Sequence, residues 1–450
     1  MVKLQVSVCK TFSKSKCNPP SCSYVNGTKR QYCRTRKKSK FGIKSESSQS
    51  ESELILNEIC PDTGMCLAFG NCIDQLNKYF HGFTNFDYTI SPINRIGIGN
   101  SGFIHEINYD NNGYKASSIL KSAMKNDSDN LVYEYLVGVE YINHILKLFP
   151  CFVETYGLYY YDTPESWILF KNTDRLDSSN LQHLILQNNV NYIKACTESK
   201  SAACLIQHIN KAYTIYDLYT SNDFLKFDLV FVLFIIYHAL SSLTKTFTHY
   251  DLHSNNVLMY QPNGQVIEYH YHYSDGTSHS FYSLYIPKII DYGRSFFNNG
   301  NISSHKIYKT ICNTKECDHK CGNNVGFKWL SNYGRKKDEI TDIRLLNDVK
   351  HGIMDNLLPG IAINDLKRLL YGIGKPVDNI IYENLTPTTF SRGASTNIYN
   401  LTVAFTALKY IVSDPDVLIE NRNTFSQRRK IGDLHVYDDG RPMKFEKNSI

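Results

Sequence analysis

The sequence that decides the fold is His249-Tyr250-Asp251-Leu252-His253-Ser254-Asn255-Asn256, which is followed by Asp291-Tyr292-Gly293. It places a carboxylate, an amide five positions later and a second carboxylate in one order along the chain. Transfer of a terminal nucleotide phosphate requires two Mg²⁺ ions over the phosphates and a carboxylate that orients the attacking hydroxyl. In such chemistry Asp251 would be the catalytic base, and Asn256 and Asp291 would be the metal ligands.

A glycine-rich segment lies upstream and reads Ile96-Gly97-Ile98-Gly99-Asn100-Ser101-Gly102. A dinucleotide-binding turn would open a helix directly. Here the alternating segment Phe103–Tyr109 and the turn Asp110-Asn111-Asn112-Gly113 predict a β-hairpin instead. We therefore expect a hairpin that closes over phosphates, with nucleotide contacts from the glycine-rich segment, Phe103 and Ile104.

Lys121 follows Gly102 by 19 residues and ends the apolar strand Ser118-Ile119-Leu120. Its ammonium would point at the α- and β-phosphates, where a positive charge offsets the clustered anionic oxygens. The alternative is an ordinary solvated lysine. The spacing from the glycine-rich segment favours the catalytic interpretation.

These five elements, in this order, resemble a eukaryotic-type protein kinase over roughly residues 90 to 350. The tyrosine- and asparagine-rich sequence around the motifs is similar to that of serine/threonine-protein kinases of large DNA viruses. The resemblance implies an α+β bilobal fold with a β-rich N-lobe and a mainly helical C-lobe. It also implies ATP with Mg²⁺, transfer to a Ser or Thr hydroxyl, and a location in the cytoplasm, nucleus or virion of an infected host cell.

The partner of Lys121 is expected on the following helix, which we predict from Asn130 to Leu148, and two glutamates are candidates. Glu140 has the spacing from Lys121 that is typical of the resembled family. Glu134 lies on a more apolar stripe, and a buried acid requires a buried face to be paired. The interpretation leans to Glu134 and leaves Glu140 open.

Two substitutions in the catalytic segment bear on substrate and regulation. Tyr250 stands where the resembled kinases carry an arginine that receives a phosphorylated activation segment, so control by that route is not expected. His253 replaces a lysine common in serine/threonine kinases and also occurs in small-molecule kinases of the aminoglycoside and choline type. Asp342 begins a predicted helix where kinases place an acid that braces the catalytic segment.

The adenine-binding segment is predicted after a polar insertion near residues 162–202. Ala203–Ile209 looks like the strand that enters the hinge, with Gln207 behind the adenine and His208 and Ile209 presenting backbone groups to it. A second insertion, near residues 261–287, carries alternating Tyr and His residues around Ser274-Asp275-Gly276. This pattern predicts an extended β-hairpin.

The domain organisation follows from these positions. The expected parts are a basic disordered tail (1–55), a cysteine-containing extension (56–87), an N-lobe (88–210) and a C-lobe (211–450). Leu229–Leu243 reads as a buried helix, because it falls short of the roughly 18 apolar residues of a membrane span. Asp365–Leu370 and Ala404–Lys409 read as helices, and Arg422–Lys430 as a solvated basic segment.

Charge is unevenly distributed along the 450 residues. The chain has a net charge of +6, yet Met1–Ser45 holds twelve Lys or Arg and no Asp or Glu. Such a block is usually solvated, but it could also bind nucleic acid or act as a nuclear address. The oligomeric state stays open.

Thirteen cysteines are an odd number in a chain with no visible secretory signal, so disulfides are not expected. A tetrahedral Zn²⁺ requires four N or S ligands. The segment after Asp291 offers a candidate set of such ligands, although it lacks a repeated Cys-x-x-Cys pair: His305, Cys312, Cys317, His319 and Cys321.

The leading function is therefore an active Ser/Thr protein kinase that uses Lys121, Asp251, Asn256 and Asp291. A small-molecule kinase is the alternative, because of His253 and the absence of an Ala-Pro-Glu segment. A non-catalytic scaffold with the same fold is the third hypothesis.

Overall fold

The computed structural model describes residues 22–26, 31–35, 51–60, 66–99, 102–124, 131–190, 201–307, 341–353, 360–371 and 400–448. The chain divides into two units, Met1–Ser50 and Glu51–Ile450. In the first unit, β1 (Cys22–Asn26) pairs with β2 (Gln31–Thr35) as an antiparallel hairpin. The prediction of a basic tail without secondary structure is therefore wrong for these residues.

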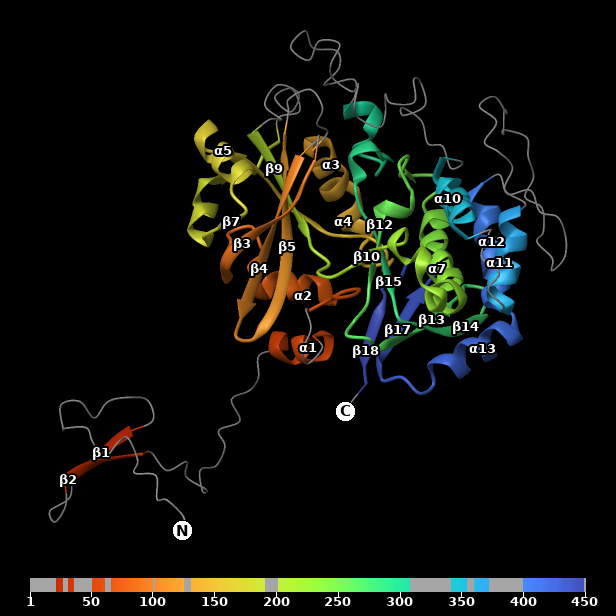
Figure 1. The fold of residues 1–450 in the computed structure, drawn as a ribbon, viewed down its shortest axis with the longest axis horizontal. Coiled ribbons are helices and arrows are strands. Elements are labelled where there is room, and N and C mark those ends of the chain that lie inside the picture. Colours follow the sequence, from red (N-terminus) through yellow and green to blue (C-terminus); the bar gives the residue numbers. More distant parts are fainter. Residues whose placement is uncertain are drawn as a thin grey trace, which may run out of the picture. The chain divides into compact units, whose positions relative to one another are not determined.

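The second unit is a mixed α+β structure whose first part is a seven-stranded antiparallel sheet (Figure 1). Buried and half-buried residues alternate along the central strand β4, as the sequence pattern predicts for a strand with one face on the core. The strands, in sheet order, are β7 (Arg175–Leu176), β3 (Thr89–Ile98), β4 (Gly102–Asn111), β5 (Tyr114–Ala123), β9 (Ala202–Gln207), β6 (Thr155–Tyr161) and β8 (Leu184–Leu186).

The described part of the first insertion is folded onto this sheet. Its short strands β7 and β8 extend the two edges by pairing with β3 and β6. Helix α5 (Pro164–Asn172) begins at a Thr163 capping box, and the indole of Trp167 donates to the carbonyl of Ala123 at 3.0 Å. The insertion thus covers both sheet edges, which would otherwise expose unpaired backbone groups.

The predicted helix between Lys121 and β6 is present and carries a π-turn. It runs through α3 (Leu131–Val137), the π-turn Gly138–Ile142 and α4 (Asn143–Ile145). A Cβ atom on Gly138 would lie 2.1 Å from Oγ1 of Thr155, so the helix contacts β6 at a distance that only glycine permits.

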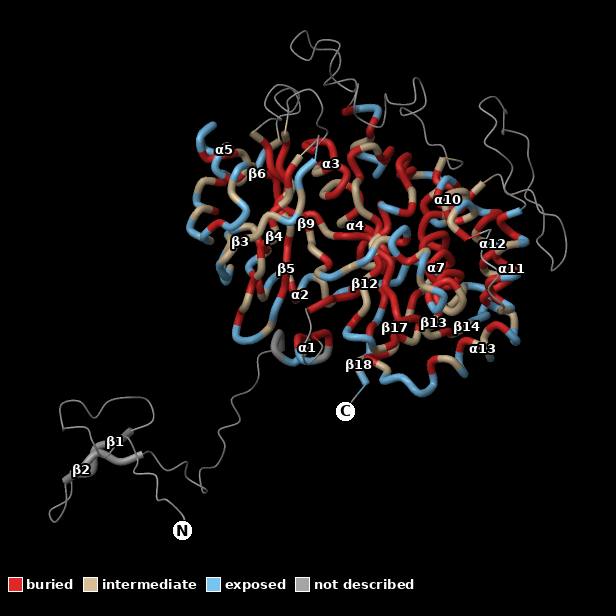
Figure 2. The backbone as a smooth tube through the Cα atoms, in the orientation of Figure 1, coloured by how far each residue is buried: buried red, intermediate tan, exposed pale blue. Residues whose placement is uncertain are grey.

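The second part of the unit is built around an apolar helix, α7 (Leu229–Ser242), as the sequence predicts. Twelve of its side chains are buried, and Figure 2 shows the helix as an almost continuous buried segment. The stretch Phe224–Ser242 is long and apolar enough to cross a membrane, but 83% of it is buried inside this fold. Helices α11 (Ile361–Tyr371) and α12 (Leu401–Val412) pack against it, and α10 (Arg344–Ile353) and α13 (Pro415–Phe425) pack against those helices.

A second sheet contains the predicted hairpin of the 261–287 insertion, formed by β13 (Val266–His272) and β14 (Ser278–Ser283). The C-terminal strands β17 (Lys430–Tyr437) and β18 (Lys444–Lys447) complete it in the order β14-β13-β17-β18. The expectation of a helical C-terminal end is wrong from Lys430 onward, where the chain forms strands, whereas Arg422, Arg428 and Arg429 are exposed as predicted. β17 pairs in parallel with β13, a partner some 160 residues away in the sequence.

The N-terminal extension is anchored to the C-terminus. Helix α1 (Glu51–Ile59) crosses the predicted boundary at residue 55, and α2 (Cys72–Tyr79) follows it. Nζ of Lys447 donates to the carbonyls of Asn57 and Cys60, each at 2.9 Å. Cys60 and Cys66 form a disulfide, which contradicts the expectation that the chain has none.

Gly138→Ala should destabilise the fold. Alanine normally stabilises a helix by about 1 kcal/mol relative to glycine, but here its methyl group would overlap the side chain of Thr155. Overpacking of this kind costs about 1–3 kcal/mol, so we expect a lower denaturation midpoint in urea or on heating. Asn423→Ala, at an exposed position of α13, is the control and should not lower it. A Gly138→Ala protein at least as stable as the wild type would contradict the close contact.

Candidate active site

The ammonium of Lys121 joins three separate elements of the fold. Lys121 belongs to β5. Its Nζ lies 2.6 Å from Oε2 of Glu134 on α3 and 2.9 Å from Oδ1 of Asp291. The structure therefore pairs Lys121 with Glu134. Glu140 lies in the π-turn, where its backbone carbonyl accepts from Nδ2 of Asn299.

The charges in this group support one another. Burial disfavours the ammonium, but the carboxylates of Asp291 and Glu134 outweigh it and raise the pKa of Lys121. The same ammonium lowers the pKa of Asp291, which is therefore ionised at neutral pH. Burial raises the pKa of Glu134, and Lys121 at 2.6 Å opposes that shift. The lysine is thus held as a cation beside an ionised carboxylate.

The segment 249–256, which the sequence pattern assigns to catalysis, is held by a buried acid, as predicted for Asp342. Its two carboxylate oxygens accept from the backbone N–H groups of His249 at 2.7 Å and Tyr250 at 2.9 Å. Tyr250 has φ = 66°, a left-handed conformation that is unusual for a large side chain. The carboxylate of Asp342 stabilises this bend, because it satisfies both N–H groups at the point where the chain turns.

The same segment is tied to the strand before Asp291. Nε2 of His249 donates to the carbonyl of Ile290 at 3.0 Å, and the Ile290 N–H donates to the carbonyl of Asn256 at 3.0 Å. Nδ2 of Asn256 donates to the backbone carbonyl of Asp251 at 2.9 Å. Burial lowers the pKa of His249, so the neutral ring that these contacts require is the stable form. Asp251, Asn256 and Asp291 therefore converge on one site.

Tyr292, which follows Asp291, is buried as predicted and uses its hydroxyl. The hydroxyl donates to the carbonyl of Ile289 at 2.7 Å and accepts from the Val153 N–H at 3.0 Å. Asp291 itself has φ = 69° and ψ = 64°. A buried tyrosine on one side and Lys121 on the other thus hold this strained residue in place.

Two arginines that sequence analysis did not single out as site residues contact the carboxylate of Asp251. The guanidinium of Arg294 lies 2.9 Å from Oδ2, and that of Arg344 lies 2.8 Å from Oδ1. His253 is farther away, with Nε2 at 3.9 Å from Oδ1. In the sequence, only their positions point to these arginines: Arg294 is three residues after Asp291, and Arg344 is two residues after Asp342.

The described part of the glycine-rich segment closes as a tight hairpin, with the Gly99 N–H donating to the carbonyl of Gly102 at 2.8 Å. Ile96 and Ile98, on either side of Gly97, are 50% and 59% exposed, which leaves apolar surface available to a ligand. Ile104 is half-buried on the neighbouring strand. Asn100 and Ser101 lie outside the described residues.

Phe103 corrects the predicted set of nucleotide contacts. Its side chain is fully buried, and its ring packs against Trp167 and His105 in the core of the sheet. Strand residues alternate between the two faces, so Phe103 and Ile104 point in opposite directions. Only the backbone of Phe103 is left to contact a nucleotide.

The prediction that Gln207 lies behind the adenine is also corrected. On β9, Cys204 lies opposite Lys121 and Ile206 opposite Ile119, so these side chains share the face that carries the lysine. Gln207 is directed to the other face. Ile206, and not Gln207, therefore shares the face of the sheet that carries Lys121, and Ile209 follows in the connecting segment.

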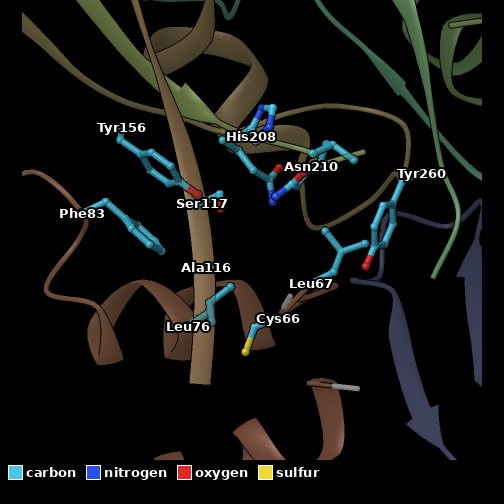
Figure 3. A pocket seen from close by; sticks show the side chains of 12 residues that line it. Cys66, Leu67, Leu76, Phe83, Ala116, Ser117, Tyr156, His208, Asn210 and Tyr260 are labelled. Carbon is cyan, nitrogen blue, oxygen red and sulfur yellow. The ribbon is translucent and has the colours of Figure 1, made fainter. Parts of the chain in front are cut away.

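Gln207 instead lines a pocket behind that connecting segment (Figure 3). The pocket combines side chains of the N-terminal extension with residues of β5, β6 and β12 (Val257–Tyr260). The N–H of His208 donates to the carbonyl of Ser117 at 3.1 Å, and Ile209 is buried. Of the expected backbone contacts to the base, the N–H of His208 is therefore already engaged. The labelled lining residues are Cys66, Leu67, Leu76, Phe83, Ala116, Ser117, Tyr156, His208, Asn210 and Tyr260.

Oxygen ligands suited to Mg²⁺ are present at the site. Asp291 offers a carboxylate whose pKa is lowered by Lys121, and Asn256 carries an amide oxygen beside the nitrogen that donates to the Asp251 carbonyl. The zinc candidates Cys312, Cys317, His319 and Cys321 lie outside the described residues, whereas His305 is exposed.

A separate cluster on the second sheet consists of Glu268, His270 and Asp433, whose ligand atoms lie within 4.8 Å of one another. Nζ of Lys430 lies 2.8 Å from Glu268 and 2.9 Å from Asp433. An internal cation thus already neutralises these carboxylates.

Neither a protein-family model nor a curated protein matches this chain. The interpretation of the site therefore depends on its own geometry.

Glu134→Gln should destabilise the protein, whereas Glu140→Gln should not. The first change removes the charge of a buried carboxylate 2.6 Å from Lys121, and loss of such a partner costs about 1–3 kcal/mol. Glu140 is the matched control on the same helix. The measurement is the free energy of unfolding in urea. Equal effects of the two substitutions would contradict the assignment of Glu134 as the partner.

Proposed function

We propose that the protein is an ATP-dependent kinase of the eukaryotic protein-kinase type that phosphorylates Ser or Thr hydroxyls. The observation that carries the proposal is the convergence of Lys121, Glu134, Asp251, Asn256 and Asp291 from distant parts of the chain. A sheet part followed by a helical part is compatible with a bilobal fold in which nucleotide binds between the two.

Each residue has a role that its environment supports. Lys121, held as a cation by Glu134, would bind the α- and β-phosphate oxygens. Asn256 and Asp291 would hold Mg²⁺, which when bound neutralises charge on the phosphates. Asp251 would accept a hydrogen bond from the acceptor hydroxyl. The acceptor oxygen bonds to the γ-phosphorus, the bond to the β-phosphate oxygen breaks, and the hydroxyl proton passes to Asp251.

A small-molecule kinase remains the second candidate. His253 is half-buried with its Nε2 3.9 Å from the carboxylate of Asp251, so a histidine rather than a lysine stands two residues after the proposed base. The scaffold hypothesis is less favoured, because the lysine, base and metal ligands required for turnover are all present.

Lys121→Met, Asp251→Asn and Asp291→Ala should each remove phosphoryl transfer. Loss of a general base alone costs about 10²–10⁴-fold in rate, and loss of the lysine or a metal ligand removes charge stabilisation of the transferred group. The assay is transfer of label from γ-³²P-ATP, with Mg²⁺, to a generic protein acceptor and to small alcohols. Chelation of Mg²⁺ should stop transfer, and its re-addition should restore it.

Glu165→Gln, at an exposed position of α5, is the matched control and should keep wild-type turnover. Circular dichroism should show that all variants are folded. Turnover at the wild-type rate in Asp251→Asn or Lys121→Met would refute the proposed mechanism. Transfer to alcohols alone would favour the small-molecule candidate.

A further inference from the structure

The arginines on Asp251 bear on what kind of acceptor can reach the base. Asp251 is only 11% exposed in its side chain, whereas Arg294 is 29% and Arg344 is 44% exposed. The two arginine side chains are thus more exposed to solvent than the carboxylate. Because a guanidinium contacts each oxygen of that carboxylate, an acceptor hydroxyl that hydrogen-bonds to Asp251 would lie close to the arginines.

Both arginines are held by the parts of the fold that hold the base. Arg294 ends the short turn Tyr292–Arg294 that follows Asp291. Arg344 begins α10, two residues after Asp342, whose carboxylate binds the backbone of the catalytic segment. Asp348, one turn farther along the same helix face, accepts from the N–H and hydroxyl of Ser254 at 3.0 and 2.8 Å. Helix α10 therefore fixes the position of Arg344 relative to Asp251.

The position of Arg344 is electrostatically unusual for a residue at the start of a helix. The N-terminal turn favours negative charge, so a guanidinium there is opposed by the helix dipole and requires an anion nearby. Asp251 supplies one anion in this structure. Arginine also binds carboxylates and phosphates with a planar, multi-donor geometry.

Catalysis requires a carboxylate oxygen of Asp251 to accept from the acceptor hydroxyl, yet each oxygen is contacted by a guanidinium at 2.8–2.9 Å. An acceptor that carries its own anion could attract the arginines and leave Asp251 available. We propose, on the basis of the proposed function, that Arg294 and Arg344 form an anion-binding site for an acidic acceptor. The favoured acceptor is a protein segment in which carboxylates flank the Ser or Thr.

The test compares three serine peptides that differ only in whether Glu, Gln or Lys flanks the serine. The wild-type full-length protein should show a kcat/KM about tenfold higher for the Glu peptide than for the Gln peptide, the factor expected from one charged contact. Arg344→Gln and Arg294→Gln should each bring this ratio close to one. Arg344→Lys, which keeps the charge but loses the planar fork, should retain part of it.

Arg368→Gln is the matched control, because Arg368 is a helical arginine of α11 that pairs with Asp365 at 2.6 Å. It should leave the ratio unchanged. A second readout does not depend on chemistry: binding of fluorescent peptides with Ser replaced by Ala, measured by anisotropy. The Glu version should bind more tightly than the Gln version to the wild type, and Arg344→Gln should remove that difference.

The outcomes separate this inference from the proposed function. Phosphorylation of all three peptides with equal kcat/KM would overturn the acidic-acceptor site and leave the kinase proposal standing. Arginine-dependent binding of the Glu peptide without transfer to any acceptor would support the anion site and refute the kinase. Transfer to glycerol 3-phosphate but to neither glycerol nor the peptides would support anion recognition and assign the anion to a phosphorylated small molecule. Absence of both transfer and binding preference would overturn both.

Discussion

The contact on which the site depends is the ammonium of Lys121 between the carboxylates of Glu134 and Asp291. It joins the sheet and helix α3 to the segment that follows β15 (Ile286–Ile289), which is 170 residues farther along the chain. The carboxylate of Glu134 is buried, and a buried charge is unfavourable unless it is paired. Its pairing with Lys121 therefore links the geometry of the site to the packing of α3.

A second buried charge organises the other half of the site. The carboxylate of Asp342 is fully buried and satisfies two backbone N–H groups at the left-handed bend of Tyr250. A buried carboxylate that accepts such bonds stabilises one backbone conformation much more than its alternatives. The side chain of Tyr250 is buried where the resembled kinases place an arginine. The arginines near the base are instead supplied by Arg294 and by α10.

Patterns of neighbouring residues predicted those helices and strands that depend mainly on residues close together in the sequence. The hairpin of β13 and β14 and the buried helix α7 follow from alternation and apolar content, and a buried stripe favoured Glu134 as the partner of Lys121 but left Glu140 open. Gln207 was misplaced because an error of one residue in a strand exchanges its two faces. The face follows only from register, here Ile206 opposite Ile119.

Long-range contacts could not be predicted in the same way. β17 pairs in parallel with β13 across some 160 residues, and nothing in the local pattern of either strand specifies that partner. Arg344 reaches Asp251 because α10 is positioned by Asp342 and Asp348, two acids that bind the backbone or side chains of the catalytic segment. Such a contact depends on how a helix docks, and only the folded chain defines it.

Two of the carboxylates to which the proposed function assigns a role are paired with cations of the protein. Asp291 is paired with Lys121, and Asp251 with Arg294 and Arg344. Binding of metal and nucleotide would exchange the first pair, because Mg²⁺ competes for Asp291 while the phosphates attract Lys121. ATP and Mg²⁺ alone offer no anion that would replace Asp251 as the partner of Arg294 and Arg344, provided that these arginines face the acceptor rather than the nucleotide. An anionic group on the acceptor would supply it, and a neutral acceptor would have to approach Asp251 while both guanidinium groups still contact its oxygens.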